Sequence, residues 1–320
     1  MVNQINTSSV VCLGGGTATR NLLKGLSGEF SNITTILSMA DDGGSGGRLR
    51  RLYNLPLGNL IDCMASFPGN DQLVASLMTY RFPGERYGKD HHLGGHKLGN
   101  LMLVALTQIT GDFSTAVAQL QRMFGIQGKF LPATKLPVTI SAITSEGQEV
   151  FGEEQIDLGK YKGKKVLQKV LLHPSDAKAG EGVVDSIMQA KIIICGPGDL
   201  YTTLLPALIV PEINKALQKT KAQKIFVVNV ANKPVETRGY TVTNFIQAIK
   251  KHIGTFPFDT VLINNNFNNP IPQQYKYTYV PYDLKDLPTD YKYIEADVVD
   301  QTFPLSHDPQ KLAKVIQSLL

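Results

Sequence analysis

Short apolar runs that end abruptly at glycine, aspartate or asparagine are the feature that most constrains this chain. Five such runs, rich in β-branched residues, are spread along the 320 residues, and most precede a stretch of helical periodicity. This alternation is typical of a parallel sheet with helices on both faces. We therefore expect an α/β fold with a mostly parallel sheet. The runs are residues 10–13, 33–39, 191–195, 225–230 and 260–263.

Several helices follow from apolar spacing and capping residues. Leu22, Leu23 and Leu26 mark one face of a helix that ends before Gly28. Residues 101–109 are apolar nearly all round, which predicts a buried helix. Two more helices are expected: one that begins at Asp112 or Ser114 and runs to about Phe124, and a last amphipathic helix after His307-Asp308-Pro309.

The middle of the chain has a different pattern, with a period of two. Residues 138–143 alternate between apolar and polar, and the turn Ser145-Glu146-Gly147 separates them from a second short run at 148–151. This predicts a β-hairpin. We expect a single α/β domain over residues 1–320 with a β-rich insertion at about 129–175. The basic cluster at 160–165 is interpreted as a solvated loop in preference to an anion contact.

The charge balance narrows the choice of partners. Lysine and arginine total 32 and aspartate and glutamate 27, which gives a formal net charge of +5. An excess this small suits an anionic ligand, whereas a protein that reads nucleic acid usually clusters its basic residues. We therefore expect a small anionic ligand and no nucleic-acid partner.

The cysteines and the apolar runs indicate the compartment. The chain has three cysteines, Cys12, Cys63 and Cys195, without the paired spacing of a disulfide framework or a zinc site. No apolar run approaches the roughly 18 residues of a membrane span, and the first residues do not resemble a secretory signal. We expect a reduced, cytoplasmic protein with no membrane span.

The first of four unusual loops is Gly14-Gly15-Gly16-Thr17, which follows a predicted strand and opens a predicted helix. Backbone N–H groups can approach a phosphate closely where Cβ atoms are absent, and a helix N-terminus favours negative charge. We interpret the loop as phosphate-binding, with a tight structural turn as the alternative. It matches neither the dinucleotide fingerprint nor a P-loop.

The second loop, Asp41-Asp42-Gly43-Gly44-Ser45, also follows a predicted strand. Adjacent carboxylates in this position can hold a divalent cation such as Mg²⁺, position an attacking hydroxyl or accept from a ribose. The glycines and Ser45 would let backbone amides surround an anion. A capped flexible loop is the alternative.

The third loop contains His91, His92 and His96 and ends at Asn100. Zinc is disfavoured because no cysteine or carboxylate stands at ligand spacing beside these histidines. We expect His96 and Asn100, at the start of a helix, to present polar groups into the crevice at the strand ends, with Asn100 as a ligand contact. A histidine with a purely structural role is nearly as good an account.

The fourth loop repeats the arrangement of the first. Gly196-Pro197-Gly198 follows a strand and leads to Tyr201 and Thr202 near a predicted helix start. Two anion-binding helix starts on one sheet suggest a ligand with two phosphates, or with phosphates and a sugar. Asn229, at the end of the next strand, is a candidate contact for the sugar or base.

In this order, the four loops resemble those of the CofD/YvcK-like family, which joins the 2-phospho-L-lactate transferases to the bacterial gluconeogenesis factors. The resemblance is to the gluconeogenesis-factor branch and covers nearly the whole chain. It implies a Rossmann-like core with three layers, α/β/α. One loop departs from the family pattern Gly-Asp-Ile-Arg-Asn and reads Gly58-Asn59-Leu60-Ile61-Asp62. Further matches are Ile109-Thr110-Gly111-Asp112-Phe113, Leu131-Pro132-Ala133, Gly196-Pro197-Gly198 with Leu200-Tyr201-Thr202, and Asn229-Val230 with Glu236-Thr237.

The two branches of the family imply two functions. The gluconeogenesis-factor branch implies a regulatory protein that binds UDP-sugars such as UDP-N-acetylglucosamine and acts in cell shape and wall growth on gluconeogenic carbon sources. The transferase branch implies Mg²⁺-dependent transfer of a phosphoryl-linked group from a nucleotide diphosphate to an alcohol. In that case Asp41 or Asp42 would ligate Mg²⁺ and His96 would accept the alcohol proton.

Two further expectations concern a redox cofactor and the oligomer. A nicotinamide-dependent dehydrogenase would need the full glycine fingerprint, which this chain lacks, so we expect no bound redox cofactor. The apolar helices and the tyrosine-rich tail would permit a homodimer.

Overall fold

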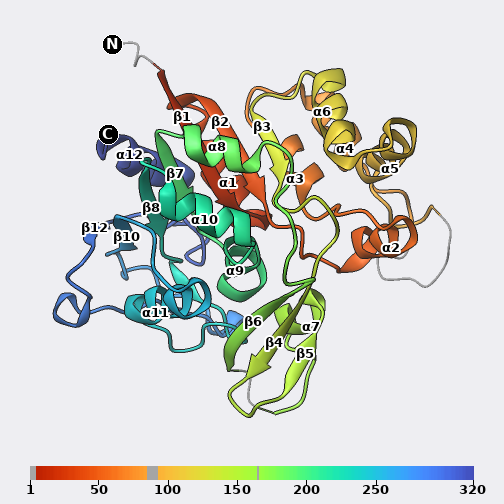
Figure 1. Ribbon diagram of the computed structural model, residues 1–320. Helices are drawn as coiled ribbons and strands as arrows, with labels where there is room; N and C mark the ends of the chain where they lie inside the picture. The colour runs from red at the N-terminus through yellow and green to blue at the C-terminus, as the bar shows by residue number, and fades with distance from the viewer. Residues whose placement is uncertain (1–4, 85–92, 164–165) are drawn as a thin grey trace.

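A sheet of seven strands forms the centre of the computed structural model, which describes residues 5–84, 93–163 and 166–320 (Figure 1). The strands lie in the order β12 (Lys292–Ala296), β10 (Thr260–Asn264), β8 (Gln223–Val227), β7 (Ile192–Cys195), β1 (Asn6–Gly14), β2 (Phe30–Leu37) and β3 (Lys129–Pro132). Every neighbouring pair is parallel. The predicted parallel α/β sheet is confirmed, and each of the five predicted runs overlaps one of these strands.

Helices cover both faces of the sheet. On one face α1 (Gly16–Leu26) packs against α12 (Pro309–Ser318), and on the other α8 (Val183–Gln189) packs against α10 (Pro211–Lys219) (Figure 1). A Cβ atom on Gly25 would lie 2.0 Å from the carbonyl oxygen of Pro309, so the contact between α1 and α12 requires glycine there. The other helices are α2 (Gly44–Tyr53), α3 (Leu60–Ala65), α4 (Gln72–Thr79), α5 (Leu98–Thr110), α6 (Phe113–Phe124), α9 (Leu205–Leu208) and α11 (Val242–Ile253).

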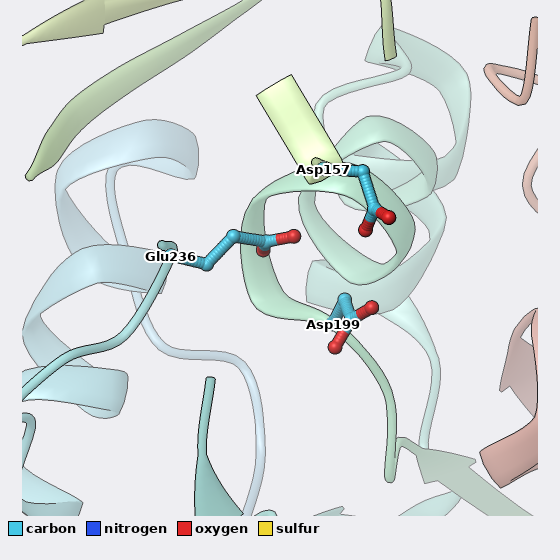
Figure 2. Close-up of side chains that lie close together, drawn as sticks. All are labelled: Asp157, Asp199 and Glu236. Atoms are coloured by element: carbon cyan, nitrogen blue, oxygen red, sulfur yellow. The ribbon is translucent and has the colours of Figure 1, made fainter. Parts of the chain in front are cut away.

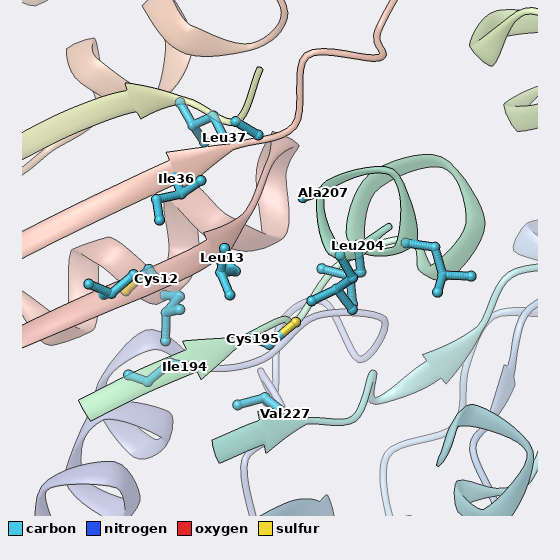
Figure 3. Close-up of a cluster of buried hydrophobic side chains, with 14 of the residues drawn as sticks. Cys12, Leu13, Ile36, Leu37, Ile194, Cys195, Leu204, Ala207 and Val227 are labelled. Atoms are coloured by element: carbon cyan, nitrogen blue, oxygen red, sulfur yellow. The ribbon is translucent and has the colours of Figure 1, made fainter. Parts of the chain in front are cut away.

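The core lies between the sheet and these helices. Figure 3 shows apolar side chains of the central strands, among them Leu13 and Ile194, beside Leu204 and Ala207 of the segment after β7. All three cysteines are buried and free, as expected for a reduced protein. Among the described residues, no helix combines the length and the apolar character needed to cross a membrane.

The β-rich insertion is a separate antiparallel sheet below the central one (Figure 1). Its strands lie in the order β5 (Glu149–Phe151), β4 (Thr139–Thr144) and β6 (Leu167–His173), and it carries the short helix α7 (Glu153–Asp157). The predicted hairpin is confirmed as β4 and β5. The expected start at about 129 is wrong, because β3 pairs with β2 in the central sheet. Lys164 and Lys165 of the basic cluster lie outside the described residues.

The helix expected to be buried, α5, is buried on one side only. Leu103 and Val104 are buried, whereas Ile109 is 79% exposed. Its neighbour α4 buries Met78 alone, and Leu73 and Leu77 are exposed. Apolar composition predicted the helix correctly but not its burial, because composition does not show how many sides the neighbouring helices cover. The predicted cap of α6 is confirmed, since the Asp112 carboxylate accepts from the Thr115 amide.

Candidate functional site

A cleft lies where the order of the strands reverses. From β1 the chain proceeds outward through β2 and β3, and from β7 it proceeds the other way through β8, β10 and β12. Ligands of open α/β sheets bind at such a switch point, outside the carboxyl ends of the strands. The cleft there has a volume of about 350 Å³. Its lining comprises Gly15, Gly16, Thr17, Ala18, Asn21, Pro197, Gly198, Asp199, Thr203, Asn229, Val230, Ala231, Tyr277, Phe303, Leu305, Ser306 and His307.

The first glycine turn forms one wall of the cleft. The Gly15 amide donates to the Thr19 hydroxyl over 2.6 Å, and a Cβ on Gly14 would lie 2.3 Å from that same oxygen. Gly16 has a φ of +66°, a conformation that favours glycine. Among the described residues no side chain caps α1, and its first turn contains no acidic residue. The start of this 11-residue helix can therefore attract an anion.

The second glycine turn forms the opposite wall, but its amides already have partners. The Gly198 amide donates to the Asn229 side-chain oxygen over 3.0 Å, and the Asn229 side-chain nitrogen donates back to the Gly198 carbonyl over 2.9 Å. A Cβ on Gly196 would lie 2.7 Å from the Val227 carbonyl oxygen. Glycine at 196 and the Asn229 side chain thus hold β7 and β8 together beside the cleft.

The helix start after this turn is also occupied. It is a single π-helical turn, η1 (Leu200–Leu204), and the buried carboxylate of Glu236 accepts from the Tyr201 amide (3.0 Å) and the Thr202 hydroxyl (2.7 Å). The Tyr201 phenol lies 2.7 Å from that of Tyr240, away from the cleft lining. The expected pair of anion-binding helix starts is therefore reduced to one, at α1.

Three carboxylates gather beside the cleft, from segments far apart in the sequence. Asp157 ends α7, Asp199 follows β7 and lines the cleft, and Glu236 lies in the turn after β9 (Ala231–Asn232) (Figure 2). Their oxygens lie within 4.8 Å of one another, a spacing that could hold a metal ion. However, the Lys233 ammonium lies among them and donates to Asp157 and to Asp199, 2.8 Å away. The group therefore does not suit a divalent ion while Lys233 stays in place.

The two adjacent aspartates of the second loop have structural partners. The Asp42 carboxylate accepts from the amides of Glu153 (3.1 Å) and Glu154 (3.0 Å), and so caps the N-terminus of α7. Asp41 accepts from the Gly43 amide over 3.1 Å, and burial raises the pKa of its carboxyl. Neither lines the cleft. Their expected role as Mg²⁺ ligands remains a prediction.

These acidic residues and two cations form what we call the acidic junction: Asp41, Asp42, Glu153, Asp157, Asp199 and Glu236, with Arg50 and Lys233. Burial and the neighbouring carboxylates Asp41 and Asp157 raise the pKa of Glu153 to about 10. Burial and Asp199 raise that of Glu236 to about 7. Arg50 is buried and donates to the carbonyls of Met39 (2.9 Å) and Val138. The junction thereby joins the insertion to the central sheet.

The remaining predicted residues lie around the second and third loops. Gly44 begins α2, and Ser45 is buried and accepts from Arg81 over 3.0 Å. His96 and Asn100 are also buried, at the start of α5. None of them lines the cleft. His91 and His92, in the disfavoured zinc interpretation, lie outside the described residues.

The tail supplies cleft residues that the sequence reasoning missed. Tyr277 and Phe303 of the tail line the cleft, and Phe303 is 43% exposed. His307 also lines it, and burial lowers the pKa of this imidazole to about 4. The tyrosine-rich composition of the tail indicated that aromatic rings are available there. Because the tail has no periodicity, the sequence does not indicate which of these rings lie beside the sheet.

Known proteins resemble this chain over its whole length. The family described as 2-phospho-L-lactate transferase CofD matches residues 10–302. The gluconeogenesis factor of Bacillus subtilis (strain 168) is 35% identical, over 97% of this chain and 98% of that protein. The gluconeogenesis factor of Halalkalibacterium halodurans is 33% identical, over 96% and 95%. A crystal structure of a UPF0052 family member from Bacillus halodurans superposes with a TM-score of 0.86 at 32% identity, covering 98% of this chain and 99% of that one.

Proposed function

We propose a function from one premise: the chain belongs to the 2-phospho-L-lactate transferase CofD family, in which relatives that match its full length are gluconeogenesis factors. The proposed function is binding of a nucleotide sugar, UDP-N-acetylglucosamine or a close analogue. The protein would act in the cytoplasm as a regulator of cell shape and wall growth when carbon is supplied through gluconeogenesis.

The cleft at the switch point is the observation that carries this proposal. Its volume of about 350 Å³ lies within the usual range of ligand pockets, and its lining combines chemically distinct groups. The start of α1, with Gly16 and Thr17, offers amides and a hydroxyl to phosphates. No lysine or arginine is among the described lining residues, so backbone amides and the helix dipole supply the attraction for an anion.

The aromatic residues of the lining suit a nucleobase. The rings of Tyr277 and Phe303 offer surfaces on which a base can stack, an interaction worth about 1–3 kcal/mol per base. Asp199 and Asn229 also line the cleft and can accept hydrogen bonds from sugar hydroxyls. A nucleotide sugar has all three of these chemical parts.

Calorimetric titration with UDP-N-acetylglucosamine, with NAD and GTP as controls, tests the proposal. We expect saturable binding of the UDP-sugar alone and recovery of the intact ligand. Binding of NAD or GTP with equal affinity, or no binding of the UDP-sugar, would refute it. Recovery of cleaved nucleotide would identify an enzyme instead of a regulator.

Transfer of a phosphoryl-linked group from a nucleotide diphosphate to an alcohol is the second candidate function. The position of Asp199 favours it, because a carboxylate in the cleft wall can accept the proton of an attacking hydroxyl. His96, the expected proton acceptor, does not line the cleft. Phosphorus NMR with a matched donor and acceptor in the presence of Mg²⁺ would detect turnover. A protein that binds nucleotide without turnover would exclude this candidate.

We further propose that the chain forms a homodimer through the exposed faces of α4 and α5. Neither helix contains a charged residue, and Leu73, Leu77 and Ile109 are exposed. Homodimer interfaces are more apolar than the rest of the surface, so this face of one protomer is suited to pack against the same face of its partner. Light scattering should show a dimer that Ile109→Lys weakens at least about tenfold, whereas Leu284→Lys, at an exposed leucine elsewhere, has no effect. A monomeric wild type would refute the proposal.

A further inference from the structure

Lys233 occupies the centre of the three carboxylates beside the cleft. Its ammonium is hydrogen-bonded to Asp157 and lies 2.8 Å from an oxygen of Asp199 and 3.5 Å from an oxygen of Glu236. The Lys233 side chain is 14% exposed and that of Glu236 is fully buried. An ammonium in this position is held on several sides by negative charge.

The turn after β9 fixes the direction of this side chain. The Lys233 amide donates to the Thr237 hydroxyl over 3.0 Å, and its carbonyl accepts from the Thr237 amide over 3.1 Å. These bonds place Lys233 and Glu236 on one tight turn, three residues apart. Burial alone would lower the pKa of the lysine, but the carboxylates of Glu236, Asp199 and Asp157 together raise it above its usual value. The lysine is therefore charged throughout the physiological range.

We infer that the Lys233 ammonium is the resident cation of the cluster and takes the place that a divalent metal ion would otherwise hold between Asp157, Asp199 and Glu236. The ammonium and a metal ion would compete for the same carboxylate oxygens. A metal ion would need the oxygens of Asp157 and Asp199 that now accept from the ammonium. It would also approach a fixed positive charge, which is costly in a partly buried site.

The resident ammonium has a consequence for the cleft. Asp199 is the one acidic residue in the described lining, and its negative charge opposes an anionic ligand. Lys233 offsets that charge from behind the wall. Its charge also reaches Tyr277: burial raises the pKa of this phenol, and the Lys233 ammonium acts in the opposite direction. Binding of an anion in the cleft would then require no divalent ion at this cluster.

Binding of Mn²⁺ alone, followed by electron paramagnetic resonance, tests the inference independently of the proposed nucleotide ligand. The wild type and Asp199→Asn are compared first. Asp199 is 37% exposed on its side chain, so the change to asparagine should leave the fold intact. We expect the two proteins to bind Mn²⁺ alike, because no metal uses this carboxylate. At least tenfold tighter binding by the wild type would overturn the inference.

The lysine itself supplies the complementary measurement. Lys233→Met keeps the length of the side chain and removes its charge. We expect the variant to gain a Mn²⁺ site with a Kd at least tenfold below that of the wild type, and Lys233→Met/Asp199→Asn to lose it again. Lys160→Met, which removes the partner of Glu154 on the same insertion, is the matched control and should gain nothing. A folded Lys233→Met protein that binds Mn²⁺ no better than the wild type would contradict the inference. If this variant does not fold, the comparison of the wild type with Asp199→Asn is the deciding test.

Discussion

The cleft and the acidic junction lie side by side and share Asp199, yet they consist of different kinds of residue. The cleft consists largely of backbone and small residues, such as Gly16 and Gly198, and the rings of Tyr277 and Phe303 also belong to its lining. The junction consists of charged side chains that already have partners, such as Asp42 on the amides of α7. Conspicuous charge therefore marks the place where the insertion is attached, whereas the glycine turn at the start of α1 marks the place where an anion can bind.

This difference follows from the cost of desolvating charge. A buried carboxylate is tolerated only when donors or a counter-ion satisfy it, and a group satisfied in that way has little capacity left for a ligand. Glu236 shows the effect, because it accepts from Tyr201 and Thr202 and also lies beside Lys233. Four experiments test whether the cleft and the junction differ in this way.

The largest effect is expected from Gly16→Asp, in the cleft. Asparagine tolerates a positive φ and has the same shape as aspartate, so Gly16→Asn is the matched control. A carboxylate about 4 Å from a phosphate costs up to about 4 kcal/mol at the protein surface, so the affinity for UDP-N-acetylglucosamine should fall about 100-fold relative to the asparagine variant. Equal affinities of the two variants by calorimetry would show that the phosphate does not bind at the start of α1.

The next effect concerns Glu153→Gln, in the junction. The pKa of this carboxyl is raised from 4.5 to about 10 in the fold, so the folded state binds more protons than the unfolded state between these values. Stability then falls as the pH rises through this window. Glutamine stays neutral, so the difference in free energy of unfolding between the variant and the wild type should shift in favour of the variant by about 2 kcal/mol from pH 5 to pH 9.

Urea denaturation at both pH values measures this difference. Asp112→Asn is the control. The Thr115 amide lowers the pKa of Asp112, so this carboxyl changes the stability only at pH values below the usual pKa range of aspartate. The control should therefore show no trend between pH 5 and 9. A Glu153→Gln difference that is independent of pH would mean that Glu153 is ionised in the folded protein.

A smaller effect is expected from Asp42→Ala. The change removes the cap of α7 and should lower the free energy of unfolding by about 1.5 kcal/mol, as losses of helix N-caps commonly do. Affinity for the nucleotide sugar should change less than about twofold. Asp112→Ala removes the cap of α6 and is the matched control for stability. A tenfold loss of affinity without loss of stability would restore Asp42 as the ligand residue that the sequence predicted.

The smallest effect belongs to Thr17→Ala, which removes one hydroxyl from the cleft wall. One hydrogen bond is worth about 1 kcal/mol, so affinity should fall about fivefold. Thr79→Ala, on the exposed side of α4, should leave the affinity unchanged. An unchanged affinity for Thr17→Ala would leave the backbone amides as the sole contacts to phosphate at the start of α1.

The sequence predicted the fold better than it predicted the site. Each strand of the central sheet that was expected is present, because β-branched runs between glycine-rich loops have few other ways to bury themselves. The burial of α5 was overestimated, since coverage depends on neighbours that the sequence does not specify. The start of the insertion was misplaced because a four-residue strand such as β3 has too little length for its period to be recognised.

For the site, residues of short turns at strand ends could be grouped from the sequence, and their binding of a ligand remains a prediction. Gly15, Gly16, Thr17, Gly198 and Asn229 line one cleft, as expected of turns at strand ends. The contacts of Asp42 with α7 and of Lys233 with Asp157 join residues 76 or more positions apart. Such pairings depend on how the insertion folds back, and no single segment of sequence contains that information.

The cleft is assembled from both halves of the sheet, and this has a consequence for synthesis. Its lining extends from Gly15 to His307, so a ribosome must deliver the chain as far as His307 before the last wall can close. A nascent chain that has formed β1, β2 and the insertion still lacks the segment with Phe303. Ligand therefore cannot assist the early steps of folding, and any stabilisation that it provides begins only after the segment with Phe303 and His307 has been made.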